Sequence, residues 1–193
     1  MIKQLIRALI VTVILVVITG VLYPLVITAV GQVAFHHTAD GSVVEANGKP
    51  VGSSLIGQDW KGTQWFYGRP SAVNYDASTS AGTNLGPNSQ QLASDIEKRA
   101  EAIVSLEGQY RPGLTTAQIP SDLLTSSASG LDPQISPAAA SFQAPRIAAV
   151  RHISVGEVNQ LIEQSTNGKT LGFLGEPRVN VLELNAAIAR LAG

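Results

Sequence analysis

The chain has 193 residues with 13 Lys and Arg, 14 Asp and Glu, and no Cys, and this length predicts one domain with an appendage. Once Lys3 and Arg7 are set aside, 11 basic residues remain against 14 acidic ones with no basic run, which argues against nucleic acid or an anionic membrane surface as partner. The absence of Cys excludes disulfides and thiolate metal sites.

The first predicted element is an apolar segment. Residues 8–30 carry no charge and are mostly Leu, Ile and Val. At about 1.5 Å per residue they form a helix of roughly 34 Å, enough to cross a hydrocarbon core of about 30 Å. We therefore predict one transmembrane helix over 8–30. A cleaved signal peptide with a small-residue site at 29–31 is the alternative, and it would leave a secreted protein.

Charges that flank this segment predict its orientation. Lys3 and Arg7 precede it without an acidic residue, whereas the twenty residues that follow it hold one basic residue against two acidic ones. Lys and Arg favour the cytoplasmic side. Residues 1–7 are therefore expected in the cytoplasm and residues 31–193 outside it.

Two residues inside the segment favour packing against other membrane helices. Pro24 removes one backbone donor and is expected to kink the helix. Gly20, one turn earlier, offers a flat surface to a neighbouring helix. A helix that serves only as an anchor needs neither residue.

Beyond the segment, the pattern predicts a mixed α+β domain with a small sheet. A hairpin is expected over 42–56, because Asn47-Gly48 lies between two apolar runs. An amphipathic helix of about 17 residues is expected within 88–108, ending at Gly108.

Residues 65–88 have neither helical nor strand periodicity, yet they join turn-forming residues to large rings. Half of the ten aromatic residues fall between positions 60 and 75, namely Trp60, Trp65, Phe66, Tyr67 and Tyr75. A long ordered loop of this kind is more often functional than incidental. Two interpretations stay open: the loop packs on its own core, or it docks on a partner.

A further helix is predicted to start at Ser136, because Ser is a good N-cap and Pro137 suits the first helical position. Pro145 is expected to kink or split that helix.

The C-terminal part predicts three more elements. Ser154 and Glu157 form a capping-box pattern, which opens a helix that should stop at Asn167-Gly168. Residues 178–184 alternate like a strand with one buried face. Residues 185–192 are expected to form a closing helix.

The sequence lacks recognisable catalytic motifs. The stretch NGKT, 167–170, ends like a phosphate-binding loop, but Glu163 stands where the first Gly of that motif belongs, so a helix C-cap is preferred. No G-x-S-x-G elbow occurs. His36 and His37 are adjacent and diverge, and His152 suits a helix C-terminus. We expect neither a catalytic nor a metal site.

Several long stretches resemble one known family, in order and nearly end to end. These are GSSLIGQ (52–58), GRPSAVNY (68–75), SAGTNLGPN (80–88), DLLTSSASGLDPQISPAAA (122–140), PRIAAVR (145–151) and LGEPRVNVLELNAAI (174–188). They resemble the C subunit of the bacterial Kdp-type potassium-transporting P-type ATPase. Departures are mild: the family often has Gly-Gly at Ala81-Gly82, and His is common where this chain has Gln134.

The resemblance implies an accessory, non-catalytic subunit of a high-affinity potassium import complex in the bacterial inner membrane. It implies three partners: a channel-like potassium-binding subunit, a P-type ATP-hydrolysing subunit and a small single-span subunit. It implies no cofactor of the chain's own, since ATP and K⁺ are handled by the complex. The family is described as a catalytic chaperone that raises the pump subunit's affinity for ATP. A signal-anchored extracytoplasmic hydrolase or a binding module is the alternative.

The resemblance also suggests which residues anchor the loops or contact partners. The candidates are Arg69, Pro70, Ser71, Asn84, Asp132, Asn180 and Asn185, together with Gly20 and Pro24 for packing in the membrane. Direct contact with ATP is not expected, because the predicted orientation puts residues 31–193 on the opposite side from cytoplasmic nucleotide.

Overall fold

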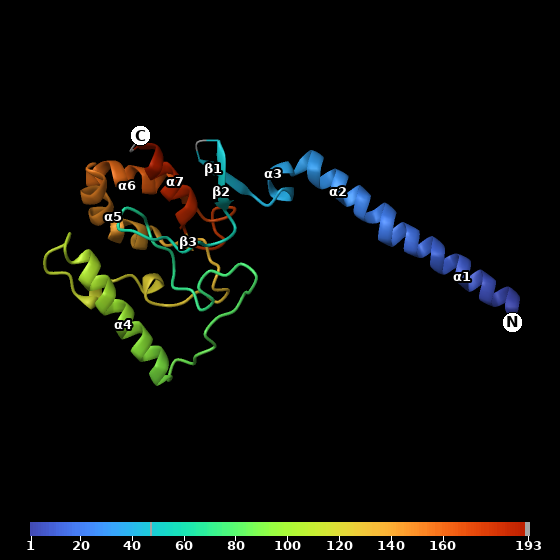
Figure 1. Ribbon diagram of the computed structural model, residues 1–193, viewed down its shortest axis with the longest axis horizontal. Helices are drawn as coiled ribbons and strands as arrows, with labels where there is room; N and C mark the ends of the chain where they lie inside the picture. The colour runs from blue at the N-terminus through green and yellow to red at the C-terminus, as the bar shows by residue number, and fades with distance from the viewer. Residues whose placement is uncertain (47, 192–193) are drawn as a thin grey trace. The chain divides into compact units, whose positions relative to one another are not determined.

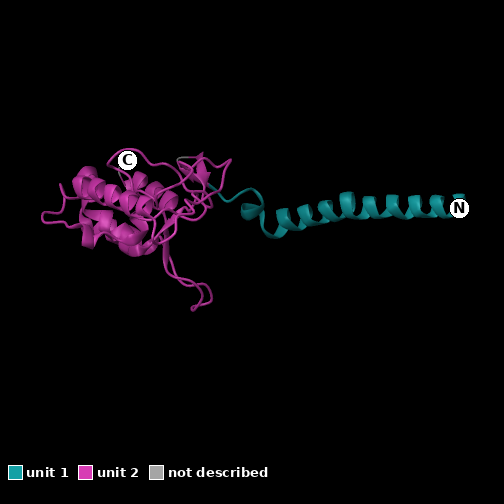
Figure 2. Ribbon diagram, turned by 90° about the horizontal axis from the view of Figure 1, so that it is seen from below, with its two compact units in different colours: residues 1–43 teal, residues 44–193 magenta. Residues whose placement is uncertain are grey.

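The computed structural model of the chain describes residues 1–46 and 48–191 and divides into two compact units. Unit 1 comprises residues 1–43 and unit 2 comprises residues 44–193 (Figure 1, Figure 2). Unit 1 is mainly helical, whereas unit 2 combines helices with short strands.

Unit 1 is built on an apolar helix that runs from Ile2 to Ala34. It comprises α1 (Ile2–Val17), a π-helical turn (Ile18–Leu22) and α2 (Tyr23–Ala34), and the short α3 (His36–Ala39) follows. The helix has 33 residues and is therefore longer than the predicted 8–30 at both ends. By length and composition it is able to cross a membrane.

The π-helical turn lies directly before Pro24, where the sequence predicts a disturbance of the helix. Pro24 has no N–H to donate to the preceding turn, and a π turn widens the helix locally. Thr19 Oγ1 donates to the carbonyl of Leu15 at 2.8 Å, so a side chain bonds this carbonyl of the preceding helical turn. Gly20 falls inside the π turn, and a Cβ there would meet no atom within 4 Å.

Unit 2 contains the other elements of the described residues, although the first of them begins at Val43, the last residue of unit 1. They are β1 (Val43–Ala46), β2 (Lys49–Ser53), α4 (Gln90–Glu107), two 3₁₀ turns (Thr116–Gln118 and Ser121–Leu123), β3 (Gln134–Ile135), α5 (Pro137–Arg151), α6 (Val155–Gln164), β4 (Thr166–Asn167), β5 (Arg178–Asn180) and α7 (Val181–Leu191). The strands β1 and β2 pair as the predicted hairpin. Asn47 itself lies outside the described residues, and Gly48 has a φ of 70°.

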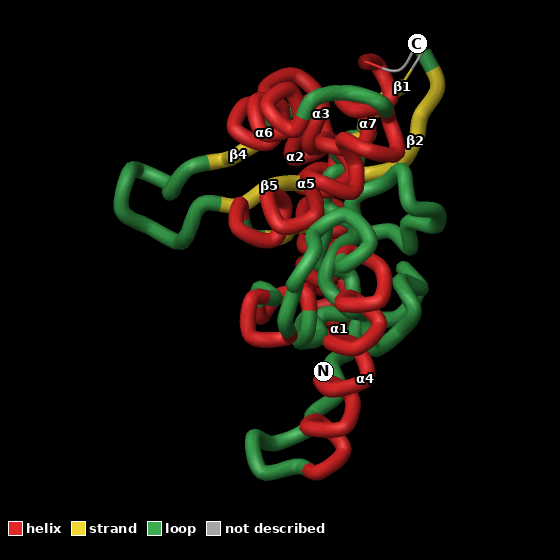
Figure 3. The backbone as a smooth tube through the Cα atoms, turned by 90° about the vertical axis from the view of Figure 1, so that its left-hand side faces the viewer, coloured by secondary structure: helices red, strands yellow, loops and turns green. Residues whose placement is uncertain are grey.

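The second sheet has the order β3-β5-β4 and is antiparallel throughout. Ile135 of β3 and Thr166 of β4 both pair with Val179, so the middle strand β5 is fixed from two sides. Figure 3 shows β4 and β5 side by side, with their connection extending away from the body. The α+β class with a small sheet is thus confirmed.

Helix α5 forms the centre of the core and packs mainly on α6. Eight of its fifteen residues are buried, including several alanines that let neighbouring elements approach closely. Helix α6 contributes Val158 and Ile162, and α7 contributes Leu184 and Ile188, all at most 2% exposed. Phe66 from the 65–88 segment joins the same core at 0% exposed.

The predicted starts of α5 and α6 are confirmed, and α4 begins with a cap of the same kind. Ser89 caps α4 by accepting from the Leu92 N–H, and Ser136 caps α5 by accepting from the Ala139 N–H. The predicted capping box of α6 is present in both directions. These bonds join residues three apart in sequence, which is why the sequence reveals them.

Pro145 does not split α5, which is one helix from Pro137 to Arg151, and the alternative of a kink stays a prediction. Three other predictions in the C-terminal part are wrong: the end of α6, the interpretation of NGKT and the strand over 178–184. Helix α6 ends at Gln164 rather than at Asn167-Gly168, because residues 166–167 pair with β5 as β4; the helix C-cap reading of NGKT is wrong for the same reason.

The predicted strand over 178–184 is the third error, because only Arg178–Asn180 is extended. The Asn180 side-chain oxygen accepts from the Glu183 N–H at 3.1 Å and so caps a helix that begins at Val181. The apolar residues of 181–184 fit one face of a strand and also one face of a helix. The capping bond from Asn180 favours the helix.

Candidate functional site

The backbone of the 65–67 segment is held by two side-chain amides from distant helices. Asn185 of α7 accepts from the Phe66 N–H at 2.9 Å and donates to the Phe66 carbonyl at 3.0 Å. Gln143 of α5 does the same to Tyr67, at 2.9 and 3.1 Å. Each amide therefore replaces the neighbouring strand that this backbone lacks, and both are buried.

Arg146 of α5 completes this support, although it is 0% exposed. Its Nη1 donates to the carbonyls of Thr63 and Trp65, the latter at 2.9 Å, and its Nη2 donates to Gln143 Oε1 at 2.9 Å. Its Nε donates to Glu107 Oε1 of α4 at 2.8 Å. The Arg146 guanidinium thus joins the backbone of residues 63–65 to side chains of α4 and α5.

The electrostatics of this pair follow from burial. Desolvation raises the pKa of the Glu107 carboxyl, and the Arg146 and Arg111 charges act in the opposite direction. The guanidinium carbon of Arg146 also lies 4.7 Å from the centre of the Tyr67 ring, a cation–π distance. The aromatic loop, defined here as residues 65–82, is therefore held by charge and amide groups as well as by apolar packing.

The aromatic loop is also joined to a second segment, the serine loop (residues 125–132). Ser71 Oγ donates to the Gly130 carbonyl at 2.6 Å and accepts from the Tyr75 N–H at 2.9 Å. The N–H of Ser127 donates to the Pro70 carbonyl at 3.1 Å. A Cβ on Gly82 would approach the serine-loop backbone to 2.9 Å, so glycine is needed where the two loops come closest.

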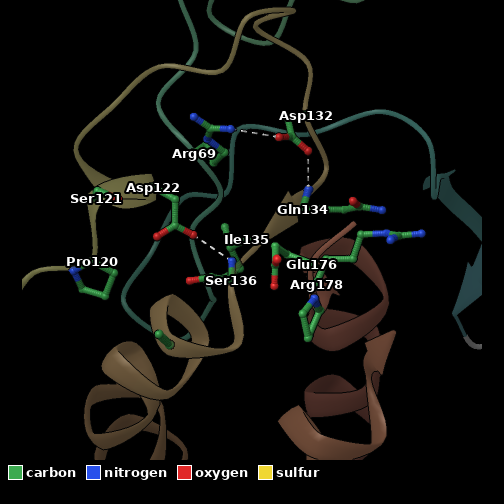
Figure 4. A pocket seen from close by; sticks show the side chains of 12 residues that line it. Arg69, Pro120, Ser121, Asp122, Asp132, Gln134, Ile135, Ser136, Glu176 and Arg178 are labelled. Carbon is green, nitrogen blue, oxygen red and sulfur yellow. Dashed lines mark hydrogen bonds and ion pairs between the residues drawn. The ribbon is translucent and has the colours of Figure 1, made fainter. Parts of the chain in front are cut away.

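Arg69 lies where both loops meet a pocket of about 540 Å³ (Figure 4). Its Nη1 approaches Asp132 Oδ2 at 3.4 Å, and its Nη2 reaches Thr125 and the Ser126 carbonyl at 3.4–3.5 Å. Its Nε is buried without a partner among the described residues. Arg69 and Asp132 remain more than a quarter exposed, so they form part of a surface that is accessible to another molecule.

The far side of the pocket is formed by the start of α5 and the strand β5. Asp122 Oδ2 accepts from the Ser136 N–H at 2.7 Å, which fixes this end of the helix (Figure 4). Glu176 and Arg178 line the opposite wall. Gln134, which stands where the family often has His, also lines the pocket, and its N–H donates to Asp132 Oδ1 at 3.0 Å.

The structure brings together Arg69, Pro70, Ser71 and Asp132 from the predicted candidates and leaves the others apart. Asn84 is exposed, and its φ of 53° is a left-handed conformation that Asn tolerates, so its contact with a partner stays a prediction. Asn185 lies in the core under the aromatic loop. Gly20 and Pro24 belong to unit 1.

Asn180 is 4% exposed and holds another segment instead. Its Nδ2 donates to the Ser54 carbonyl at 2.7 Å while its oxygen caps α7. Sequence reasoning missed Gln143 and Arg146 altogether. Their signal was a pair of long polar side chains in the Ala-rich stretch 137–151, and both lie on the buried face of α5.

Histidines and clustered acidic residues are the side chains that could hold a metal ion in this Cys-free chain. His36 Nδ1 lies 2.9 Å from Gln32 Oε1, which accepts from it when that nitrogen carries the proton, and His36 Nε2 lies 3.3 Å from Asp40 Oδ2. His152 is exposed at the left-handed C-cap of α5. Among residues 1–46 and 48–191, no group of three or more His, Asp or Glu side chains lies close enough to hold a metal ion.

Comparison with known proteins agrees with the motif resemblance. Residues 5–190 match the family KdpC, described as the c chain of the K⁺-transporting ATPase. The chain belongs to this family. A protein of Koribacter versatilis is 46% identical over 185 residues, which cover 95% of this chain and 92% of its own length.

Two further relatives show the same extent of likeness. A protein of Methylococcus capsulatus is 48% identical over 177 residues, 90% of each chain, and one of Paraburkholderia phytofirmans is 46% identical over 190 residues, 96% of each chain. All three carry the name potassium-transporting ATPase KdpC subunit. The resemblance inferred from the sequence motifs is confirmed.

Proposed function

We propose that this chain is the accessory, non-catalytic subunit of an ATP-driven potassium import complex in the bacterial inner membrane. Its partners are a channel-like potassium-binding chain, an ATP-hydrolysing P-type chain and a small single-span chain. Its helix crosses the bilayer with residues 1–7 in the cytoplasm, and unit 2 lies outside. The chain stabilises the assembled complex and supports potassium uptake at low external concentration.

The observation that carries this proposal is the extent of the family match. It runs from residue 5 to residue 190 and so includes both the apolar helix and unit 2. A function that used unit 2 alone would not require the helix to be part of the same family pattern. The relatives are named as subunits of a potassium-transporting ATPase, and this name indicates the complex to which we assign the chain.

The two joined loops support a structural role for unit 2. They display backbone carbonyls and hydroxyls on a rigid frame, in a body with an excess of acidic residues. Hard oxygen ligands suit K⁺, so the loops stabilise the outer side of the channel-like chain or admit cations to it. The raised ATP affinity that the family description implies acts through the partner chains, since unit 2 lies on the opposite side from ATP.

The first experiment removes unit 2 and keeps unit 1. Residues 1–43 and the full chain are each co-expressed with the other chains of the ATPase, and potassium uptake at micromolar concentration is measured. We expect the truncated chain to reduce both uptake and the amount of intact complex recovered in mild detergent. Unaltered uptake and recovery with residues 1–43 alone would reject the proposal.

The second experiment tests the orientation. Because the chain has no Cys, Lys98→Cys on the exposed side of α4 introduces a single thiol. A membrane-impermeant maleimide should label it in right-side-out spheroplasts. Labelling that occurs only in inverted vesicles would reject the outside location of unit 2.

A further inference from the structure

The connection between β4 and β5 is an arm, residues 168–177, that projects from the body of unit 2 (Figure 3). Its end is a tight turn, called the tip (residues 170–174). Thr170 and Leu174 exchange two backbone hydrogen bonds of 2.9 Å, and the Gly172 N–H donates to the Lys169 carbonyl at 3.1 Å. The tip therefore has a fixed shape of its own.

The tip exposes three large apolar side chains within four residues. Leu171 is 79% exposed, Phe173 is 71% exposed and Leu174 is 50% exposed. Single exposed apolar residues are normal on a protein surface, and Leu55 at 59% is an example in unit 2. A contiguous apolar group at the end of a projecting arm is instead typical of an interaction site.

The backbone of the tip favours the same interpretation. Leu171 has a φ of 55°, a left-handed conformation that is unfavourable for a bulky residue. The glycines 172 and 175 adopt φ values of 83° and 78°, which they tolerate without strain. Strained positions of this kind cluster at binding and switch sites. Here the strain holds an exposed Leu side chain in place.

Polar groups surround the base of the arm. Lys169 lies 3.4 Å from Glu176 as an ion pair. Glu176 and Arg178 continue from the arm into the 540 Å³ pocket that also contains Arg69. The Arg178 backbone belongs to the sheet, but its side chain makes no hydrogen bond or ion pair within residues 1–46 and 48–191. An apolar centre with a polar, partly unpaired rim is the usual composition of a protein–protein interface.

We propose that the tip is the apolar anchor by which this chain docks onto another protein chain of the ATPase. The partner presents an apolar cleft that takes Leu171 and Phe173, with acidic groups beside it that meet Arg178. This proposal rests on the proposed function. A lipid surface fits less well, because the one Lys of the arm is already paired and a lipid needs no fixed turn geometry.

The test uses full-length chain co-expressed with the other ATPase chains. A variant with Leu171→Asp and Phe173→Asp is compared with the unchanged chain and with the matched control Leu55→Asp. We expect the tip variant to lower recovery of the partner chains at least about tenfold, as for an interface anchor. The control should recover them normally, and all three chains should unfold at similar temperatures.

A second variant with a smaller change tests the same contact without an introduced charge. Leu171→Cys gives a chain with one thiol, to which a short photo-crosslinker is attached in the assembled complex. A crosslink to a protein chain of the ATPase supports the proposal. Crosslinks to lipid only, or none at all, overturn it.

The failures are distinguishable. Normal recovery of partner chains by the aspartate variant overturns the role of the tip and leaves the proposed function intact. Failure of the unchanged chain to recover any ATPase chain overturns the proposed function, and this inference with it.

Discussion

The aromatic loop and the arm are both irregular segments rich in turn-forming residues, yet they differ in burial and in the source of their hydrogen bonds. The aromatic loop places Phe66 in the core and has its backbone bonded by Asn185, Gln143 and Arg146. The arm bonds chiefly to itself and exposes Leu171 and Phe173. Composition alone does not separate a loop that is part of the core from one that is offered to a partner.

The difference lies in where the hydrogen-bonding partners come from. A buried backbone without a neighbouring strand needs donors and acceptors from elsewhere. Helices α5 and α7 supply them to the aromatic loop from 76 to 119 residues away in sequence. A tight turn closes most of its bonds within five residues and remains free to project. Substitutions in the first region should therefore alter stability, and those in the second should alter binding.

The largest expected effect comes from Arg146→Met. It removes a buried charge and leaves Glu107 unpaired, which should lower the free energy of unfolding by about 3–5 kcal/mol. The measurement is urea unfolding of the full chain in detergent, followed by fluorescence of Trp60 and Trp65. Arg178→Met is the control and should stay within about 0.5 kcal/mol. Equal effects of the two variants would contradict the distinction.

Asn185→Leu should have the next largest effect. It keeps the side-chain size but leaves the N–H and carbonyl of Phe66 buried without partners, which should lower the free energy of unfolding by about 2–3 kcal/mol in total. The same unfolding assay measures it. Asn159→Leu is a matched control, because Asn159 Oδ1 is already buried without a partner, and no loss of stability is expected. A loss at both positions would show that amide removal in general is harmful.

Tyr75 gives a pH dependence that is specific to the aromatic loop. Burial, with the charges of Asp59 and Asp132, raises its pKa from 10.0 to about 12. The neutral phenol is thus favoured by folding, so its contribution is complete below pH 10 and is lost as the pH rises toward 12. Ultraviolet titration should show a late-ionising component near pH 12 that disappears in Tyr75→Phe. Identical titration curves for the two chains would refute the burial of this hydroxyl.

The smallest effect is expected at the tip, and its sign is opposite. Leu171→Asn replaces a bulky residue at positive φ by one that tolerates it, so the free energy of unfolding should rise by up to about 1 kcal/mol. Recovery of the partner chains should fall at the same time. A fall in stability of the isolated chain would indicate that the tip supports the fold and remove the contrast between the two regions.

Part of the candidate site was predictable. The loops that contain Arg69, Ser71 and Asp132 were identified by the motif resemblance, and the structure joins them through bonds such as Ser71 to Gly130. Gln143 and Arg146 were missed, because a long polar residue on a predicted helix is normally assigned to the solvent face. Neither the strand pairing of 166–167 nor the partner of Asn180 has a local signal.

By itself the sequence determined the features that depend on contacts within a few residues. These are the apolar helix, the hairpin of β1 and β2, the amphipathic helix α4, and the capped starts of α5 and α6. Tertiary structure alone decided that residues 166–167 pair with β5, that an arginine is buried in the core, and that one irregular segment is internal while another projects. The physical reason is that a buried polar group must find a partner wherever the fold provides one, and that partner is often more than 50 residues away.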